Sequence, residues 1–370
     1  MERGHSRQFD RAQGLYRWRV EPDAWLLTDA PPSAARTDLR VVALGGGTGL
    51  PIVLRGLKEL LFPGGAEWAQ TPDPHRLTAI VTVADDGGSS GRLRREYDIV
   101  APGDIRDCLL ALSDGDPLIA RLFDFRFTGN GETAGQCLGN LILTALSQLR
   151  KGFDEAVEQG GRILTIRGQV FPSTLAAVTV RAEFKDGPSV EGESRIPLAR
   201  RRIHRMHLEP PDAMALPQAL GALEAADIVV IGPGSLYTSL IPILLIKEIA
   251  EGIAGSQARV VLVANLMSEP GETDGYTVAD HVEAIRAHAT QVQIHDVLLN
   301  TAAIAKEFAE RHAADGAVPV PTAVEGVEAM GCRVVARDLL ARDPRIRHDS
   351  SKVARALVDL GPLPERSRNA

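Results

Sequence analysis

One short stretch, residues 39–50 with the sequence LRVVALGGGTGL, constrains the fold of this chain more than any other. Its apolar residues 41–44 stand between a charge and a run of glycines, as in a buried parallel strand. The residues PIVLRGLKELL follow at helical spacing, so a strand, a glycine turn and a helix are predicted to adjoin. Glycine permits close approach to a ligand, and the start of a helix attracts an anion. The predicted phosphate cradle comprises Gly45, Gly46, Gly47, Thr48 and Gly49.

The alternative interpretation of this stretch is a tight turn between strand and helix that binds nothing. Its glycine spacing does not match the GxGxxG fingerprint of dinucleotide-binding folds. It also lacks the lysine followed by serine or threonine that a Walker A loop requires. A phosphate cradle of another type therefore remains the functional hypothesis.

The same order of strand, polar turn and helix recurs along the chain. Apolar runs at residues 77–84, 227–231, 258–264 and 296–299 are each followed by small or polar residues and then by a helical pattern. A weaker strand is expected near residues 332–336, and helices over 215–225 and 351–360. This alternation predicts an α/β fold with a doubly wound, mainly parallel sheet and helices on both faces.

Two regions depart from this pattern. Residues 1–36 show no clear period, and we expect a poorly ordered or loosely docked extension. The remainder, 37–370, is predicted to form a single domain. Within this domain, residues from about 160 to 212 contain short runs in which apolar and polar residues alternate, separated by pairs of turn-forming residues. This pattern predicts a small β-rich excursion from the main sheet.

Composition narrows the range of partners and compartments. The formal net charge is −7 and no long basic run occurs, so nucleic acid is not the expected partner. The three cysteines Cys108, Cys137 and Cys332 form no CxxC pair, which fits a reducing compartment. No uninterrupted apolar stretch reaches membrane-spanning length, and the first thirty residues lack the apolar segment of a signal peptide. We therefore expect a cytoplasmic protein without membrane insertion.

Small and polar residues directly follow the second predicted strand. Adjacent carboxylates can bind a divalent cation such as Mg²⁺, whereas serine, glycine and arginine offer donors to a phosphate or a sugar. The alternative is a solvated acidic turn followed by a helix with exposed arginines. If the chain is an enzyme, Asp85 and Asp86 are also the catalytic and metal-binding candidates. The predicted site residues here are Asp85, Asp86, Gly87, Gly88, Ser89, Ser90, Gly91 and Arg92.

Three further places supply candidate site residues. Asp104 and Arg106 are predicted to lie close together, as a functional pair or as a helix cap with a salt bridge. The sequence GPGSLYTS indicates a second anion loop, with helix capping alone as the alternative. The long polar segment 265–276 begins with Asn265, and loops of that size are often functional. The second loop contributes Gly232, Gly234, Ser235, Tyr237 and Thr238.

Taken with these residues, several ordered motifs resemble those of a known family. They are GGGTGLPIVLRGLK, VTVADDGGSSGRLR, PGDIRDCLLALS, GNLILTAL, ADIVVIGPGSLYTSLIPILL, NLMSEPGETDGYTVADHV and IRHDSSKVA. They are similar to those of the YvcK-type gluconeogenesis factors, which are related to 2-phospho-L-lactate transferase, the CofD enzyme. The resemblance runs from Val41 to Leu357.

The resemblance implies a Rossmann-like fold, a cytoplasmic bacterial protein and a bound UDP-sugar, either UDP-N-acetylglucosamine or UDP-glucose. It also implies a role in cell shape and cell-wall synthesis during gluconeogenic growth, with cell-wall synthesis proteins as candidate partners. Matched by motif, the ligand would be lined by Gly45–Gly49, Asp85–Gly91, Asn140, Gly234–Thr238 and Asn265.

The two related groups differ in class. The gluconeogenesis factors imply a non-catalytic regulator that binds the UDP-sugar, whereas the transferase moves a phospholactyl group from a nucleotide diphosphate to a deazaflavin alcohol. The GETDGYTVADHV and IRHDSSKVA segments resemble the regulator branch. A regulator is therefore the leading hypothesis, and a CofD-like transferase or another nucleotide-dependent enzyme is the alternative. Formation of a homo-oligomer stays open.

Overall fold

A computed structural model describes residues 39–64, 73–150, 152–343 and 345–364, together with two short segments near the start of the chain. These segments, β1 (Gln8–Asp10) and β2 (Leu15–Arg17), pair as antiparallel strands. The rest of the predicted extension at residues 1–36 lies outside the described residues. The expectation that it is poorly ordered or loosely docked therefore stays a prediction.

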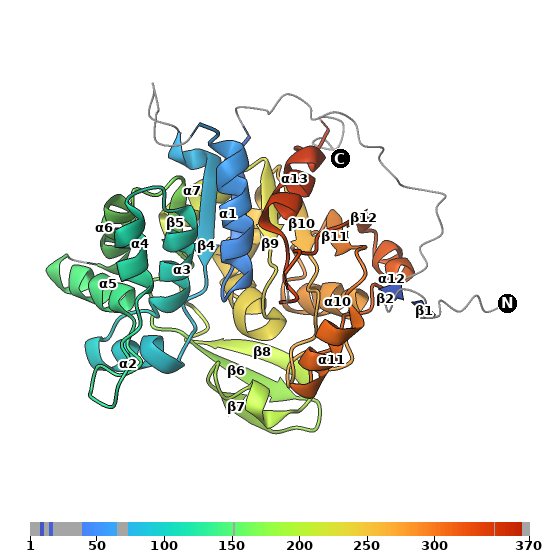
Figure 1. The fold of residues 1–370 in the computed structure, drawn as a ribbon, viewed down its shortest axis with the longest axis horizontal. Coiled ribbons are helices and arrows are strands. Elements are labelled where there is room, and N and C mark those ends of the chain that lie inside the picture. Colours follow the sequence, from blue (N-terminus) through green and yellow to red (C-terminus); the bar gives the residue numbers. More distant parts are fainter. Residues whose placement is uncertain are drawn as a thin grey trace.

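A parallel seven-stranded sheet forms the centre of the fold (Figure 1). Its strand order is β12-β11-β10-β9-β3-β4-β5, and every neighbouring pair is parallel. The predicted α/β class with a doubly wound, mainly parallel sheet is thus confirmed. The strands are β3 (Val41–Gly45), β4 (Leu77–Val81), β5 (Gln169–Pro172), β9 (Ile228–Ile231), β10 (Arg259–Val263), β11 (Asp296–Asn300) and β12 (Arg333–Arg337).

The strand order reverses direction at β3, which lies between β4 and β9. Along the chain the sheet grows from β3 to β4 and β5, then returns to the other side of β3 and continues through β9 to β12. The register places Leu44 beside both Ile80 and Ile231, so the three strands end at the same level. Ligands of open α/β sheets bind at such a switch point, beyond the carboxyl ends of the strands.

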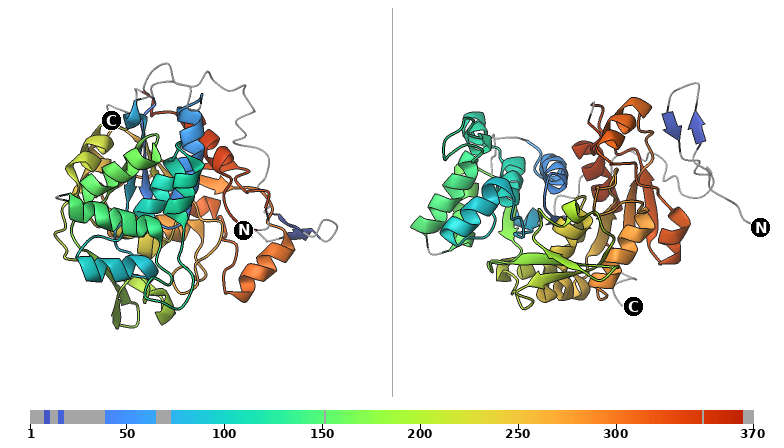
Figure 2. Two further views of the ribbon diagram at one scale, coloured as in Figure 1. Left: turned by 60° about the vertical axis from the view of Figure 1, so that its left-hand side comes forward. Right: turned by 90° about the horizontal axis from the view of Figure 1, so that it is seen from below.

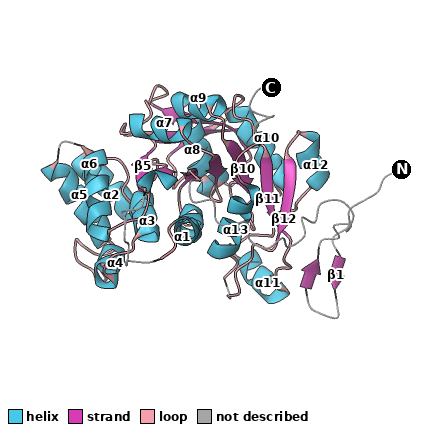
Figure 3. Ribbon diagram, turned by 90° about the horizontal axis from the view of Figure 1, so that it is seen from above, coloured by secondary structure: helices cyan, strands magenta, loops and turns pink. Residues whose placement is uncertain are grey.

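Helices cover both faces of the sheet, as predicted. In Figure 3, α7, α8, α9 and α10 lie on one face of the sheet, and α1, α3 and α13 lie on the other. Figure 2 shows that α3 also belongs to a group of helices, α2 to α6, that gathers near the edge strand β5. The helices are α1 (Gly49–Leu61), α2 (Gly88–Tyr97), α3 (Gly103–Leu112), α4 (Pro117–Asp124), α5 (Leu138–Leu149), α6 (Phe153–Leu164), α7 (Pro217–Glu224), α8 (Ile241–Leu244), α9 (Lys247–Gly255), α10 (Val278–His288), α11 (Lys306–Ala314), α12 (Val324–Ala329) and α13 (Ser350–Leu360). Shorter helical turns are η1 (Pro74–Arg76), η2 (Pro197–Ala199) and η3 (Leu236–Leu240).

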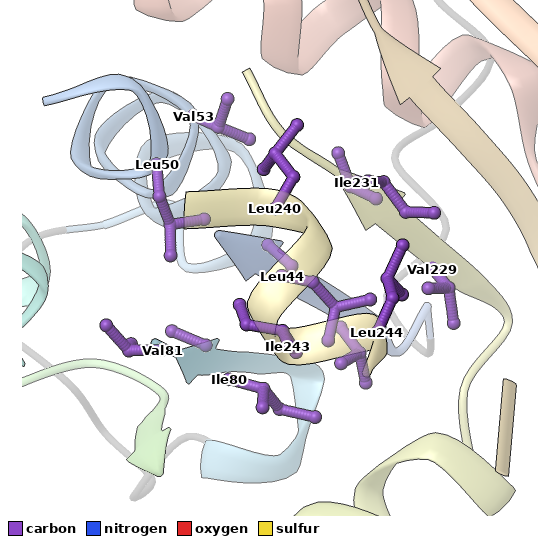
Figure 4. Close-up of a cluster of buried hydrophobic side chains, with 14 of the residues drawn as sticks. Leu44, Leu50, Val53, Ile80, Val81, Val229, Ile231, Leu240, Ile243 and Leu244 are labelled. Carbon is purple, nitrogen blue, oxygen red and sulfur yellow. The ribbon is translucent and has the colours of Figure 1, made fainter. Parts of the chain in front are cut away.

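A buried apolar cluster lies beneath the switch point (Figure 4). Side chains from β3, β4 and β9 meet those from the start of α1 and from η3 and α8. Removing this apolar surface from water favours the folded chain by about 25 cal/mol per Å², so the cluster fixes the helix starts against the strand ends. Its labelled members are Leu44, Leu50, Val53, Ile80, Val81, Val229, Ile231, Leu240, Ile243 and Leu244.

A small antiparallel sheet lies below the main sheet in Figure 1, at the end where α2 also lies. Its order is β7-β6-β8, formed by β6 (Thr179–Phe184), β7 (Ser189–Glu191) and β8 (Ile203–Glu209). The predicted β-rich excursion is therefore present, within narrower bounds than 160–212.

The predicted boundary was wrong at its start. Residues 153–164 form α6, for which the sequence analysis assigned no helix, and β5 pairs with β4 in the main sheet. Because β5 is an edge strand, only alternate residues are buried. Its pattern therefore resembles that of an antiparallel excursion strand rather than that of the fully buried central strands.

Within the residues described by the structure, no helix combines the length and the apolar character needed to cross a membrane.

Candidate functional site

The glycine loop between β3 and α1 follows the carboxyl end of a strand, as predicted, and the strand order places that strand at the switch point of the sheet. Gly47 has a positive φ of +58°, and its N–H donates to Oδ2 of Asp104 at 2.8 Å. A Cβ on Gly46 would lie 2.4 Å from the same oxygen, and one on Gly49 would lie 2.2 Å from the carbonyl oxygen of Pro233. These glycines therefore allow the loop to pack closely against α3 and against the loop that follows β9.

The start of α1 carries the main features of an anion site. The Thr48 side chain makes no capping hydrogen bond, and the first turn of this 13-residue helix contains no acidic residue. The N–H groups at a helix start have no partner within the helix, and the helix dipole makes them attractive to an anion. The predicted cradle therefore lies at a helix N-terminus, and its binding of a phosphate group stays a prediction.

The segment after β4 is more helical than predicted. The expected polar loop ends at Gly88, where α2 begins, because the positive φ of Gly88 turns the chain into the helix. Asp85 accepts a hydrogen bond from the Gly87 N–H at 2.8 Å, and Asp86 accepts one from the N–H of Ser194 at 2.9 Å. The two carboxylates therefore have different partners, and Asp86 connects the main sheet to the loop after β7.

Ser89, Asn140 and Arg106 form a buried polar network. The Ser89 hydroxyl donates to Oε1 of Gln136 at 2.6 Å and accepts from Nδ2 of Asn140 at 3.2 Å. Oδ1 of Asn140 in turn accepts from Nη1 of Arg106 at 3.0 Å, and Asn140 is 1% exposed. Both ends of the Asn140 amide are thus engaged inside the protein, which indicates a role in fixing α2 against α5.

The predicted pairing of Asp104 with Arg106 was wrong. Nη2 of Arg106 contacts Oδ1 of Asp107 at 2.5 Å instead, whereas Asp104 accepts from the glycine loop. The two residues are only two positions apart in α3, so their side chains leave the helix in different directions. Burial and the neighbouring Asp85 raise the pKa of Asp104 to about 7, although the Gly47 N–H opposes that shift.

Arg92 is exposed, and its Nη2 donates to the carbonyl oxygen of Ala134 at 3.0 Å. It therefore contacts the 128–135 loop. Arg92 and Arg106 therefore both donate hydrogen bonds to other groups of the protein.

Asn265 lies at the end of β10 and holds the loop after β9. Its Oδ1 accepts from the N–H of Gly234 at 3.1 Å, and its Nδ2 donates to the carbonyl oxygen of Gly234 at 2.9 Å. Gly232 and Gly234 both have positive φ, at 75° and 157°, so this loop requires glycine. The structure brings these three predicted residues together, with Asn265 contacting the loop backbone.

The second predicted anion loop already has internal partners. The Ser235 hydroxyl and the Leu236 N–H donate to the carboxylate of Glu269. The N–H groups of Tyr237 and Thr238 donate to Glu272, and Oγ1 of Thr238 contacts Oε1 of Glu272 at 3.1 Å. Ser235 itself makes no capping hydrogen bond to the helical turn, so the contacts come from glutamates of the 265–276 segment instead of from the predicted capping by the loop.

Sequence reasoning missed three carboxylates at this end of the sheet, namely Glu193, Glu269 and Glu272. Burial, followed by Asp85 and Glu272, raises the pKa of Glu193 to about 8. Burial also raises the pKa values of Glu269 and Glu272, and the charge of Glu269 adds to the effect on Glu272. The length and polarity of segment 265–276 was a signal for two of them, whereas Glu193 is distant in sequence and had none.

A pocket beyond β10 and β11 adjoins these loops. Asn265 is one of its lining residues and also bonds the backbone of Gly234 in the loop after β9. Asn300, which ends β11, accepts at its Oδ1 from the N–H groups of Ala302 and Leu339 at 3.1 and 3.0 Å. Further lining residues are Leu266, Val278, Pro319, Val320 and Thr322.

The same region offers few ligands for a metal ion. Within the described part of the chain, no three His, Cys, Asp or Glu side chains are grouped so as to hold a metal ion. Mg²⁺ commonly binds through one or two carboxylates together with phosphates of a substrate. Asp85 and Asp86 are the carboxylates predicted from the sequence for that mode, and they accept from the N–H groups of Gly87 and Ser194.

The protein is of the α/β class, with a parallel sheet and glycine loops at its switch point. Comparison with known proteins identifies its family. The family model of 2-phospho-L-lactate transferase CofD matches residues 41–340, and the chain therefore belongs to the CofD family. The curated relatives are gluconeogenesis factors. That of Listeria monocytogenes is 43% identical over 327 residues, which covers 88% of this chain and 97% of the relative. That of Bacillus subtilis is 43% identical over 322 residues, covering 87% and 98%.

Solved structures agree with this assignment. A crystal structure of a Bacillus halodurans protein has a TM-score of 0.81 and 40% sequence identity to this chain. It covers 87% of this chain and 99% of its own. The resemblance to the gluconeogenesis factors inferred from the sequence motifs is thus confirmed.

Proposed function

We propose that this protein binds a nucleotide sugar of the UDP-N-acetylglucosamine or UDP-glucose kind and acts as a regulator rather than as an enzyme. The observation that carries the proposal is the start of α1, which has no side-chain cap and no acidic residue in its first turn and lies at the switch point. The diphosphate of the ligand would lie against this helix start and the glycine loop.

The pocket beyond β10 and β11 would receive only a small part of the ligand, because its volume of about 30 Å³ admits one or two water-sized groups. That pocket combines apolar side chains such as Leu266 and Val278 with the amides of Asn265 and Asn300. Small-molecule sites typically have this mixture of an apolar lining and a few placed polar groups. Because the pocket shares Asn265 with the loop after β9, one extended molecule could contact both parts of the site.

The charges around the site favour binding over group transfer. Transfer of a phospholactyl group develops negative charge that cations normally stabilise. Here Arg92 donates to Ala134, and Arg106 donates to Asn140 and Asp107. Beside the glycine loop, the buried Asp104 accepts from the Gly47 N–H, so α3 brings a carboxylate rather than a cation to this place. The alternative, a CofD-like 2-phospho-L-lactate transferase, is supported by the name of the matching family model.

The name of the curated relatives supports the biological part of the proposal. A protein that senses a nucleotide sugar could report the supply of cell-wall precursors during gluconeogenic growth. We therefore include in the proposal a cytoplasmic role in cell shape and cell-wall synthesis, with cell-wall synthesis proteins as partners.

Calorimetric titration with UDP-N-acetylglucosamine, with and without Mg²⁺, followed by product analysis, tests the biochemical part. Saturable binding with the ligand recovered intact would support the regulator. Turnover, or binding of a guanosine diphosphate compound in place of any uridine ligand, would favour the transferase. If a chelator leaves the affinity for the UDP-sugar unchanged, Mg²⁺ at Asp85 or Asp86 must be removed from the proposal.

A further inference from the structure

The segment that enters β8 carries an unusual concentration of positive charge. Five of the eleven residues from 195 to 205 are arginine, and positions 194–208 contain no carboxylate side chain. The chain as a whole has the opposite balance, with a formal net charge of −7. Apolar residues interrupt the arginines, so they do not form one continuous basic run. This arginine cluster comprises Arg195, Arg200, Arg201, Arg202 and Arg205.

The fold holds the arginine cluster on the outside of the molecule. All five arginines are exposed, whereas the apolar residues between them, Ile196, Ile203 and Met206, are at most 1% exposed. These buried side chains fix the backbone of the segment, so the charges are kept at the surface. The small sheet that contains the segment forms the lower end of the molecule in Figure 1.

Most of this charge is not neutralised by the protein itself. Within the described ranges, Arg195, Arg200 and Arg205 have no ion pair and no side-chain hydrogen bond. Arg201 pairs with Asp186 at 2.7 Å, and Arg202 stands over the Tyr276 ring at 5.6 Å. The cluster therefore keeps more positive charge than its neighbours remove.

The nearby carboxylates of the small sheet are engaged elsewhere. Glu183 lies opposite Arg205 in the strand register, but its Oε2 lies 3.5 Å from Nε2 of His207. Glu209 pairs with Arg181 at 3.5 Å, at the other end of β8. These contacts leave the end of the sheet beside η2 as its basic part.

An exposed leucine stands among the arginines. Leu198 is 79% exposed in η2, with Arg195 before it and Arg200 after it. A single exposed apolar side chain is ordinary on a protein surface, and Leu149 at the end of α5 is equally exposed. The combination of an exposed leucine with arginines on both sides is what distinguishes this place.

We propose that this end of the molecule adsorbs to a membrane surface rich in anionic phospholipids. The guanidinium groups of the arginine cluster would contact the phosphates of the headgroups, to which arginine donates in pairs of hydrogen bonds. Leu198 would reach the boundary between headgroups and acyl chains, while the arginine stems lie along it. This attachment is at the surface and requires no helix that crosses the bilayer.

The observations favour a lipid surface over an acidic protein as the partner. A tight protein interface centres on a packed group of large apolar or aromatic anchors. Here one leucine stands alone among charges, on a projecting turn, which is the arrangement that an interfacial lipid contact uses. The inference goes beyond the proposed function, because it concerns a different surface and holds whether or not a nucleotide sugar binds.

The net charge of the chain makes the proposal specific to this surface. A protein of net charge −7 is repelled by an anionic membrane except where positive charge is concentrated. Adsorption should therefore depend on the arginine cluster and on salt, since charges are screened beyond about 10 Å at 0.1 M and about 3 Å at 1 M ionic strength.

Co-sedimentation of the full chain with vesicles tests the proposal. The vesicles contain phosphatidylglycerol and phosphatidylcholine in equal parts, or phosphatidylcholine alone. We expect binding to the anionic vesicles only, and its loss when the salt is raised from about 0.1 M to about 1 M. Arg200→Gln combined with Arg205→Gln should weaken binding about 25-fold, or about fivefold for each arginine. Leu198→Ser should weaken it about three- to tenfold.

Matched controls change the same residue types elsewhere on the surface. Arg121→Gln on α4 combined with Arg355→Gln on α13 removes the same charge, and Leu149→Ser removes an equally exposed leucine. Neither control should alter vesicle binding. All substituted side chains are exposed, so every variant should fold, as circular dichroism will verify.

Three results would overturn the proposal. The first is a wild-type chain that leaves the anionic vesicles unbound. Its capture on immobilised polyglutamate instead would assign the cluster to an acidic protein segment. The second is an equal loss of binding in the control arginine pair, which would show that only net charge matters. The third is vesicle binding by Leu198→Ser as tight as that of Leu149→Ser, which would remove Leu198 from the contact with lipid.

Discussion

Asp104 connects the glycine loop to α3, and its environment makes it a proton-binding group near neutral pH. The Gly47 N–H donates to its carboxylate, and a side chain on Gly46 would collide with the same oxygen. One acidic residue thus determines the shape of the predicted phosphate cradle. The residue types at positions 46, 47 and 104 are explained by one another rather than by the ligand alone.

The raised pKa of Asp104, about 7, has a consequence for stability. The folded protein holds this proton more tightly than the unfolded chain, so the free energy of unfolding should fall as pH rises from about 4 to about 7. Asp104→Asn keeps an oxygen that can accept from Gly47 and should flatten that dependence. We expect the variant to gain on the order of 2–4 kcal/mol relative to wild type between pH 4 and pH 8. Urea denaturation at both pH values measures the difference. Parallel pH profiles of the two proteins would contradict this assignment.

Asn265 is the residue whose predicted role is most altered by the structure. Both ends of its amide bond the backbone of Gly234, so Asn265→Ala removes two hydrogen bonds from one loop. We expect a loss of about 1–3 kcal/mol in unfolding free energy and weaker binding of the UDP-sugar, because the loop beside the site loosens. Asp116→Ala is the matched control, since it removes the N-cap of α4. The control should cost about 1 kcal/mol without changing affinity. Unchanged affinity in a folded Asn265→Ala protein would remove this loop from the binding site.

Among the elements, the turn at residues 269–273 depends most on its neighbours. It is clamped between η3 and η2 because Gly271 permits contact with Pro197. The turn carries both glutamates that cap η3, so its position determines whether that helix start is neutralised. The capping of η3 by this turn therefore depends on its contacts with η2 and η3, which are distant in the sequence, rather than on the sequence of the turn itself.

Two glycine-to-alanine substitutions distinguish the cost of backbone strain from the cost of a steric clash in this turn. Gly271 and Gly275 both have positive φ, at 87° and 73°, but a Cβ on Gly275 meets open space. Both alanine variants carry the backbone penalty of about 1–2 kcal/mol, whereas Gly271→Ala also collides with Pro197. We expect Gly271→Ala to be less stable than Gly275→Ala by at least about 2 kcal/mol. Thermal and chemical denaturation of both variants gives the comparison. Equal losses would mean that the contact with η2 is unimportant.

At the scale of the whole molecule, the sequence predicted the strands that each consist of one continuous apolar run. The central strands β3, β4, β9 and β10 are buried on both faces, so each appears as an apolar run. The edge strand β5 alternates between buried and half-buried residues, and its place in the main sheet could not be inferred from that pattern.

The candidate site was predicted less completely, for a physical reason. The glycine loop and Asn265 could be located because they directly follow strands. The roles of Ser89 and Asn140 depend on a network of side chains from α2, α3 and α5, which no local pattern encodes. Glu193 and Glu272 belong to two loops about 80 residues apart in the chain, and the charge of Glu272 acts on the pKa of Glu193 only in the folded molecule.

The buried carboxylates near the switch point lead to a prediction for the molecule as a whole. Asp104, Glu193, Glu269 and Glu272 all have raised pKa values, chiefly because of burial. A bound diphosphate adds negative charge beside them and should raise these pKa values further. The complex then holds more protons than the free protein, so the affinity for the UDP-sugar should fall as pH rises from 7 to 9.

Calorimetry in buffers of different ionisation enthalpy should show proton uptake on binding. Because one substitution removes one titrating group, Glu272→Gln should reduce that uptake, whereas Glu224→Gln on α7 should not. Proton release, or an uptake that is equal in wild type and Glu272→Gln, would place the diphosphate away from Glu272.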